Sequence, residues 1–223
     1  MIGRPRAHHR RTDSTNERAR ALAERGAPHG TLVTADQQTA GRGRQGRTWI
    51  APPGGGLLMS LVLRTYGEAL PLAAGVAVCE ALPLEARVKW PNDVWVAGRK
   101  IAGILVEGRP LEGWAVVGIG VNVSTERFPA ELAEAATSLR LEGSGIGKEE
   151  VLGRLLTSIE RWLERPTPEV LAAWRVLDAL RGETVHWRGG SGRVAGIDER
   201  GALLVDTATG RVTLAAGEVH LLR

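Results

Sequence analysis

The sequence has 223 residues, which fits one large domain or a catalytic domain with a small appendage, and it is long enough to bury a substantial core. Hydrophobic residues make up 43% of the chain and charged residues 24%, so the composition is that of an ordinary globular protein rather than a disordered one. The formal net charge is +4, and nearly all the positive charge is arginine. This balance suits nucleic acid, phosphorylated ligands or acidic partners, without choosing among them.

The sequence lacks the signals of a membrane or secreted protein. No apolar run approaches the roughly 20 residues of a transmembrane helix, and the basic N-terminal segment is followed by no apolar signal core. Cys79, the single cysteine, lies in an apolar run and is predicted to be a small buried hydrophobe rather than a reactive thiol. We therefore expect a cytoplasmic protein without an internal disulfide or membrane attachment.

Hydrophobic patterning predicts the elements of the first half of the chain. Ser14-Thr15-Asn16-Glu17 has the form of a capping box, so a helix is expected over residues 14–25 with Ser14 as its cap. A strand is expected at 31–35, a buried strand at 57–64 and an apolar helix at 69–82. The polar stretch at 37–56 is longer than a passive connection, which marks it as functional.

The second half of the chain predicts a sheet, two helices and a small all-β unit. Strands are expected at 86–90, 94–96, 101–106 and 114–119, and amphipathic helices at 148–164 and 168–180. From Glu183 onward, short alternating strands joined by Gly- and Asp-containing turns predict a small β-barrel. The expected fold is α+β: a mixed, largely antiparallel sheet flanked by helices over residues 1–180, followed by the barrel at 181–223.

The most informative segment is the glycine–arginine loop, residues 41–49, with the sequence GRGRQGRTW. Its glycines permit close approach of the backbone to a ligand, and its arginines can grip phosphate or carboxylate bidentately. The spacing Gly41-x-Gly43-x-x-Gly46 also matches a dinucleotide fingerprint, but the residues that follow cannot open the helix which that fold requires. A phosphate or adenylate site is favoured; a disordered nucleic-acid-binding tract is the alternative.

Two further clusters combine polar groups with strand ends. Lys89-Trp90-Pro91-Asn92-Asp93 and the nearby Lys100 can present an amide, a carboxylate and an ammonium to one cleft, although an ordinary hairpin with solvated charges stays open. In the segment GIGVNV, residues 118–123, alternating glycine implies that another backbone or a flat ligand packs closely against a strand. A β-bulge explains this glycine pattern equally well.

Together these segments resemble the biotin–protein ligase family. The matching pieces are Asp13-Ser14-Thr15-Asn16, Gln38-Thr39-Ala40 running into GRGRQGRTW, KWPNDVWVAGRKIAGILVE, GIGVNV and Ala136-Thr137-Ser138-Leu139. They follow the family's order and spacing from about Asp13 to the C-terminus. The resemblance implies a catalytic domain like those of class II synthetases and biotin–lipoate ligases over residues 1–180, with an SH3-like barrel at 181–223.

The resemblance also implies which residues act. It places biotin against Ser14, Thr15, Asn16, Gln38, Gly41, Arg42, Lys100 and Gly103, and ATP or the adenylate against Arg44, Arg47, Trp49, Asn92 and Asn122. Lys100, Arg42 and Arg44 are the implied catalytic residues, and Asp93 the implied magnesium ligand. Arg223 is a weaker candidate for contact with the nucleotide.

The implied activity is ATP-dependent formation of biotinyl-adenylate, with Mg²⁺ on the leaving pyrophosphate, followed by transfer of biotin to a lysine of a biotin carboxyl carrier protein. No DNA partner is expected, because the segment before Ser14 is too short for the winged-helix domain of the repressing members. A homodimer stays open. The competing hypotheses are a basic nucleic-acid-binding module and a lipoate-type acyl ligase of the same fold.

The sequence departs from the family pattern just before Ser14. The residues His8-His9-Arg10-Arg11 are more polar than the strand usually found there, so that strand is expected to be short or frayed. His8 and His9 are interpreted as part of an exposed basic tail rather than as a metal site.

Overall fold

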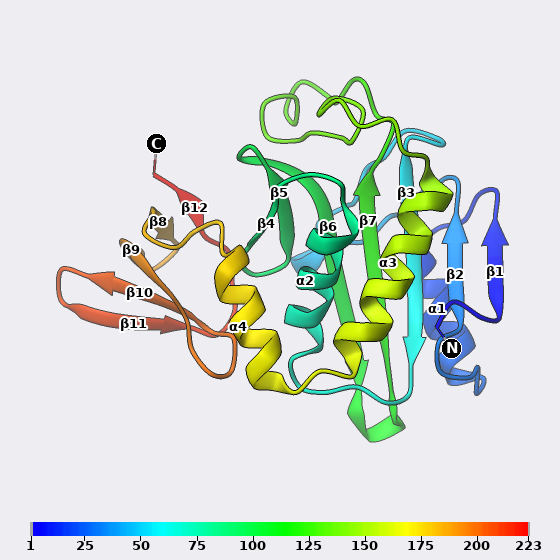
Figure 1. Ribbon diagram of the computed structural model, residues 1–223, viewed down its shortest axis with the longest axis horizontal. Helices are drawn as coiled ribbons and strands as arrows, with labels where there is room; N and C mark the ends of the chain where they lie inside the picture. The colour runs from blue at the N-terminus through cyan, green and yellow to red at the C-terminus, as the bar shows by residue number, and fades with distance from the viewer. Residues whose placement is uncertain (1, 223) are drawn as a thin grey trace.

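The computed structural model describes residues 2–222 of the chain, so the predicted role of Arg223 lies outside the described residues. The described part contains a seven-stranded sheet, four α-helices and a separate five-stranded sheet (Figure 1). The predicted α+β class is therefore confirmed.

The large sheet has the strand order β1-β2-β3-β7-β6-β5-β4. Every neighbouring pair is antiparallel except β1 and β2, which run parallel, so the mixed and largely antiparallel sheet is also confirmed. Its strands are β1 (Arg6–His9), β2 (Leu32–Ala35), β3 (Gly56–Leu63), β4 (Ala86–Lys89), β5 (Asp93–Val96), β6 (Arg99–Arg109) and β7 (Trp114–Asn122).

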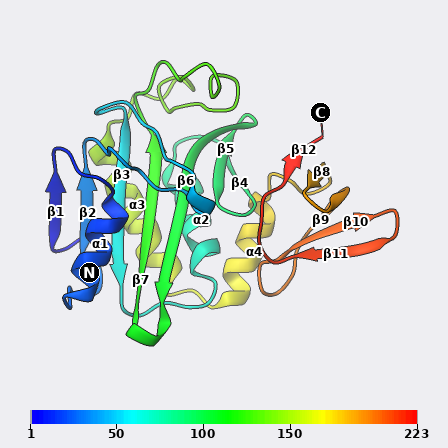
Figure 2. The same cartoon turned by 180° about the vertical axis from the view of Figure 1, so that it is seen from behind.

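Helices cover the two faces of this sheet unequally. Helices α2 (Leu70–Ala81), α3 (Lys148–Leu163) and α4 (Thr167–Leu177) lie on one face, whereas α1 (Thr15–Glu24) lies on the other (Figures 1 and 2). Because side chains alternate along a strand, neighbouring residues such as Leu32 and Val33 pack into separate hydrophobic clusters. Helix α1 packs on β2, β3 and β7, so the part of this face near β6 is left for the glycine–arginine loop.

The start of α1 differs from the predicted capping box. Ser14 is the N-cap residue, but within the described residues its hydroxyl makes no capping hydrogen bond to the helix. The first backbone N–H groups are instead bound by other side chains: Ser14 N donates to Asp13 Oδ1 at 2.7 Å and Thr15 N donates to Gln38 Oε1 at 2.7 Å. The capping box is therefore wrong, because Asp13 binds the Ser14 N–H that the pattern assigned to Glu17, and Glu17 pairs instead with Arg20 and Arg42.

The basic N-terminal segment is a strand rather than a tail. The expected short strand is present as the four residues of β1, which pair with β2 at the sheet edge. Arg6 forms an ion pair with Glu149 of α3, and His8 lies 3.0 Å from Thr34 Oγ1 and 3.3 Å from Asp36 Oδ2. The tail interpretation is therefore wrong, because an edge strand can pair its backbone on one side while its polar side chains stay solvated. Residues 2–222 contain no cluster of three or more acidic, histidine or cysteine side chains suited to a metal ion.

The second sheet has the order β11-β10-β9-β8-β12 and is antiparallel throughout. Its strands are β8 (Thr184–Trp187), β9 (Gly190–Ile197), β10 (Leu203–Thr207), β11 (Gly210–Leu214) and β12 (His220–Leu221), so the predicted C-terminal all-β unit is present. Buried residues of both sheets belong to one hydrophobic cluster, and Trp90 Nε1 donates to the Gly201 carbonyl at 3.0 Å. The domain boundary at residue 181 stays a prediction.

Helix α2 is almost entirely buried between the sheet and the other two helices, as its apolar sequence predicts. It contains Cys79, which is buried, and burial raises the pKa of this thiol to about 12. Cys79 is therefore the small buried hydrophobe that the sequence predicts. Among residues 2–222, none of the helices combines the length and the apolar character that a bilayer crossing requires.

Candidate active site

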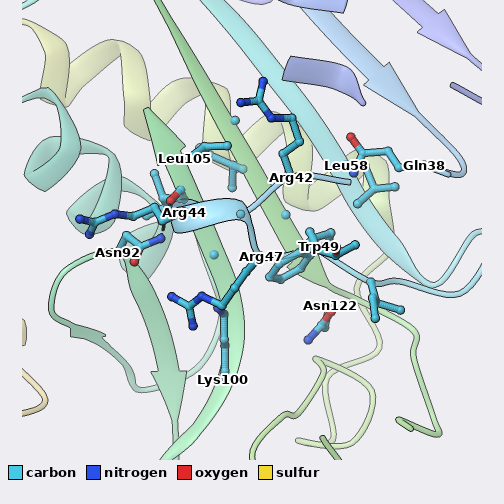
Figure 3. A pocket seen from close by; sticks show the side chains of 18 of the residues that line it. Gln38, Arg42, Arg44, Arg47, Trp49, Leu58, Asn92, Lys100, Leu105 and Asn122 are labelled. Carbon is cyan, nitrogen blue, oxygen red and sulfur yellow. Dashed lines mark hydrogen bonds between the residues drawn. The ribbon is translucent and has the colours of Figure 1, made fainter. Parts of the chain in front are cut away.

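A cavity of about 240 Å³ lies on the face of the large sheet that carries α1, beneath the glycine–arginine loop. The start of α1, the loop and strands β3, β6 and β7 all contribute to it (Figure 3). The predicted site residues that line the cavity are Ser14, Thr15, Asn16, Gln38, Arg42, Arg44, Arg47, Trp49, Asn92, Lys100, Gly103 and Asn122. Segments that are far apart in the sequence thus meet around one cavity.

One end of the cavity carries neutral hydrogen-bonding groups in a fixed arrangement. Gln38 Oε1 accepts hydrogen bonds from Thr15 N at 2.7 Å and from Thr15 Oγ1 at 3.0 Å. Because this oxygen is already paired, the amide nitrogen of Gln38 is the end that remains for a ligand carbonyl. Asn16 is only 4% exposed and is held from both sides, since its Oδ1 lies 2.6 Å from Ser60 Oγ and its Nδ2 donates to Glu107 at 2.9 Å.

Glycines on β6 and β7 make a flat surface for Trp49. Gly103 and Gly120 face each other in register, and a Cβ at either position would lie less than 3.0 Å from the Trp49 indole. Gly118 serves Asn16 in the same way, because a Cβ there would lie 1.9 Å from Asn16 Oδ1. The pairing of β7 with β3 and β6 is continuous through these residues, so close packing rather than a β-bulge explains the alternating glycines.

The opposite end of the cavity is cationic. Lys100 Nζ lies 2.6 Å from Asp93 Oδ1 and 5.5 Å from the centre of the Trp49 ring. Arg47 extends from the loop toward Lys100, and Arg44 extends toward Asn92 (Figure 3). Arg47 also forms an ion pair with Glu218, between β11 and β12. Burial lowers the pKa of Arg44, and the nearby Arg47 lowers it further. Clustered cations of this kind, with Arg44 partly buried, are suited to binding an anion.

Arg42 points the other way. Its guanidinium extends away from Lys100 (Figure 3) and pairs with two carboxylates, those of Glu17 and Glu107. The backbone of Arg42 bridges Thr48, which closes the glycine–arginine loop on itself. The predicted contact of Arg42 with carboxylate or phosphate groups of a ligand stays a prediction, and the structure gives its side chain a different set of partners.

Two buried polar atoms in the cavity wall lack partners within the described part of the chain, namely Trp49 Nε1 and Asn122 Oδ1. The other end of the Asn122 amide donates to the Thr137 carbonyl at 2.9 Å, which fixes Oδ1 as the free acceptor. An unpaired buried donor and acceptor are costly in a folded protein, and a ligand with complementary groups offsets that cost.

Comparison with known proteins agrees with this geometry. A model described as the biotin/lipoate A/B protein ligase family matches residues 9–124, and one described as the biotin protein ligase C terminal domain matches residues 180–222. The chain is 37% identical to a biotin–[acetyl-CoA-carboxylase] ligase of Paracoccus denitrificans, over 94% of this chain and 97% of that protein. This chain belongs to the biotin–protein ligase family.

Other members of the biotin–protein ligase family are similar along nearly the whole chain. The bifunctional ligase/repressor BirA of Bacillus subtilis is 34% identical over 99% of this chain and 75% of its own length. The solved structure of the biotin protein ligase from Aquifex aeolicus in complex with biotin and ATP superposes with a TM-score of 0.85 at 32% identity, covering 99% of each chain.

Sequence reasoning missed the apolar part of this ligase site. The floor of the cavity is formed by strand residues whose sequence predicts only a hydrophobic core: Leu58, Met59, Ile104, Leu105 and Ile119. Another wall is formed by the segment after β7, through Phe128, Leu132, Ala135 and Ala136. The backbone of Lys100 bonds to this segment, since Lys100 N donates to Ala135 O and Thr137 N donates to Lys100 O. The family motif at residues 136–139 was the one signal in the sequence that this segment belongs to the site.

Two predicted residues do not line the cavity. Gly41 lies just behind it, where a Cβ would meet the Trp49 carbonyl oxygen at 2.4 Å and the Gln38 amide at 2.9 Å. Asp93 is the partner of Lys100 rather than a lining residue. The turn from Lys89 to Asp93 is therefore no ordinary solvated hairpin, because Asn92 lines the cavity and its Nδ2 donates to the Ile104 carbonyl at 2.7 Å.

Proposed function

We infer that this protein is an ATP-dependent biotin–protein ligase. The observation that carries the inference is a single cavity with a neutral hydrogen-bonding end, an apolar floor and a cationic end. Biotin has the same three parts in the same order: a polar ureido ring, an apolar side chain and a carboxylate. The ring then lies against Asn16 and Gln38, and the carboxylate lies near Lys100.

The first step joins two anions. A biotin carboxylate oxygen attacks the α-phosphorus of ATP, a P–O bond to pyrophosphate breaks, and biotinyl-adenylate forms. Lys100, Arg44 and Arg47 offset the repulsion between the reacting anions and the charge that grows in the transition state. Lys100 extends from a strand, and Asp93 holds its ammonium, so this cation is already oriented before the ligands bind.

The nucleotide needs more room than the cavity offers with the glycine–arginine loop in its present position. A volume of about 240 Å³ is below the range of about 300–1,000 Å³ that is typical of ligand pockets. We propose that the loop moves outward to admit ATP and then covers the adenylate, with the free Trp49 Nε1 and Asn122 Oδ1 available to it. A covered adenylate is protected from water, which would otherwise hydrolyse the mixed anhydride.

Mg²⁺ is proposed to enter with ATP. Protein sites commonly hold this ion through one or two carboxylates together with substrate phosphates, and Asp93 is one carboxylate beside the cationic end of the cavity. A donor set this small fits an ion that the nucleotide carries rather than one that resides in the protein. When bound, Mg²⁺ neutralises charge on the leaving pyrophosphate.

The second step is proposed to use a biotin carboxyl carrier protein. A neutral lysine amine of the carrier attacks the acyl carbonyl of biotinyl-adenylate, AMP leaves, and an amide bond forms. The alternative of a nucleic-acid-binding module loses its main support, because the loop arginines line the cavity and two of them, Arg42 and Arg47, are already paired with carboxylates. The lipoate-type alternative predicts activation of lipoate, which the following experiment includes.

The test is a single reaction mixture analysed by intact mass. We expect that the protein, biotin, ATP, Mg²⁺ and a biotin carboxyl carrier domain will add one biotinyl group to one carrier lysine. Omitting ATP or replacing biotin by lipoate should abolish the change. Equal transfer of lipoate would favour the lipoate-type ligase, and no transfer of either acid, with no biotin-dependent exchange of pyrophosphate into ATP, would overturn the proposed function.

A further inference from the structure

A chain of polar contacts links the neutral end of the cavity to the glycine–arginine loop through two residues that do not line the cavity, Ser60 and Glu107. Ser60, on β3, is fully buried, and its hydroxyl lies 2.8 Å from Thr15 Oγ1 and 2.6 Å from Asn16 Oδ1. Glu107, on β6, accepts from Asn16 on one side and pairs with Arg42 on the other. We call this set the Glu107 relay.

The carboxylate of Glu107 uses its two oxygens for two different donors. Oε2 accepts from Asn16 Nδ2 at 2.9 Å, and Oε1 lies 2.9 Å from Arg42 Nη2. A carboxylate is an acceptor only, so it orients the Asn16 amide with its nitrogen toward β6 and its oxygen toward Ser60. A glutamine of the same shape has one oxygen, and its NH₂ group would face either Asn16 or Arg42, both of which are donors.

Hydrogen bonds connect Asn16 to the other residues at the neutral end of the cavity, so the orientation of its amide affects theirs. With Asn16 Oδ1 facing β3, the Ser60 hydroxyl has two acceptors, Asn16 and Thr15, for its one proton. Thr15 in turn bonds to Gln38, whose free amide nitrogen faces the ligand. The side chain of Glu107 is 26% exposed, so its interactions are only partly screened by water.

We propose that Glu107 is a positioning residue, which fixes the place of the glycine–arginine loop relative to the side chains that bind the biotin ring. Glu107 acts through Asn16 on one side and through Arg42 on the other, so one carboxylate couples the neutral end of the cavity to the glycine–arginine loop. This proposal rests on the proposed function and adds to it a residue and a role. Because the relay acts far from the reacting carboxylate, it contributes equally to binding of biotin in the ground state and the transition state.

The test is the isosteric variant Glu107→Gln, compared with the parent protein in biotin-dependent ATP–pyrophosphate exchange. We expect the KM for biotin to rise about tenfold while kcat at saturating biotin changes less than about twofold. The adenylate should also leave the variant faster, because Arg42 has lost one of its two carboxylates. Glu169→Gln, which breaks the exposed ion pair between Glu169 in α4 and Arg165 before it, is the control and should change none of these values.

A double-mutant cycle identifies the path of the effect. If Glu107 holds the loop through Arg42, adenylate release from the double variant Glu107→Gln, Arg42→Ala should be slower than the two single effects combined would predict. Should Glu107→Gln fail to fold, Ser60→Ala removes the middle of the relay and should raise the KM for biotin alone. An unchanged KM in a folded variant, or a fall in kcat at an unchanged KM, would overturn the positioning role. An inactive parent protein would instead count against the proposed function.

Discussion

Replacing Lys100 by methionine tests the cationic end of the cavity most directly. The substitution keeps most of the apolar stem and removes the ammonium that lies 2.6 Å from Asp93. Loss of one preorganised group that stabilises charge in a transition state costs about 10²–10³ in kcat, or roughly 2.7–4 kcal/mol. Because Asp93 already neutralises part of the charge on Lys100, we expect a loss near 10², at the lower end of that range.

Lys100→Met also leaves Asp93 without its cation. The side chain of Asp93 is 15% exposed, so an unpaired carboxylate there should cost about 1–3 kcal/mol of folding stability. The double variant Lys100→Met, Asp93→Asn removes that charge and should recover stability without recovering activity. The assay is biotin-dependent ATP–pyrophosphate exchange, measured well below the Tm of each variant.

Lys148 provides the matched control, because its side chain is 32% exposed against 31% for Lys100, and it also pairs with one carboxylate, Asp36. Lys148 does not line the cavity, so Lys148→Met should leave exchange unchanged. If folded Lys100→Met exchanges pyrophosphate as fast as Lys148→Met does, the role of Lys100 in adenylate formation is wrong.

The remaining predictions concern packing, pH and the thiol. Gly120→Ala puts a Cβ 2.4 Å from the Trp49 indole and should lower the free energy of unfolding by about 1–3 kcal/mol, measured with urea. Arg18 holds the pKa of Asp13 well below its ordinary value, so the carboxylate stabilises the fold near neutral pH and this contribution is lost as the pH falls through the folded-state pKa. Asp13→Asn should therefore lower Tm near neutral pH and make little difference in strong acid. Cys79, with its pKa raised to about 12 by burial, should react with a thiol reagent only after unfolding.

Each of these predictions has a result that would contradict it. Gly145→Ala, where an added Cβ meets nothing within 4 Å, is the control for Gly120→Ala, and equal urea midpoints would show that Trp49 does not need a glycine there. If Asp13→Asn lowers Tm by the same amount at neutral pH and in strong acid, the loss of stability does not come from the charge of Asp13, and the prediction is wrong. Rapid labelling of Cys79 in the folded protein would mean that α2 opens readily.

Local signals in the sequence located most elements of the fold. Apolar periodicity placed the helix at 69–82 within a residue of α2 at each end, and the glycine and turn pattern placed the strands of the large sheet. The glycine–arginine loop was singled out from its clustered cations and closely spaced glycines, whereas the role of Lys100 came from the resemblance to the family; both line the cavity. The alternation of glycines in β7 left close packing and a β-bulge equally open, and it could not say that Asn16 and Trp49 do the packing.

The sequence by itself determined the kinds of groups in the site: the cations, the amides, the glycine platform and, through its motifs, the family. Only the tertiary structure decided which of these groups face the cavity and which hold one another. Arg42 and Arg44 are two residues apart, yet Arg42 turns to Glu17 and Glu107 while Arg44 turns toward Asn92 (Figure 3). The physical reason is that the direction of a long charged side chain is set by the nearest opposite charge, and Glu107 comes near Arg42 only after β6 has paired into the sheet.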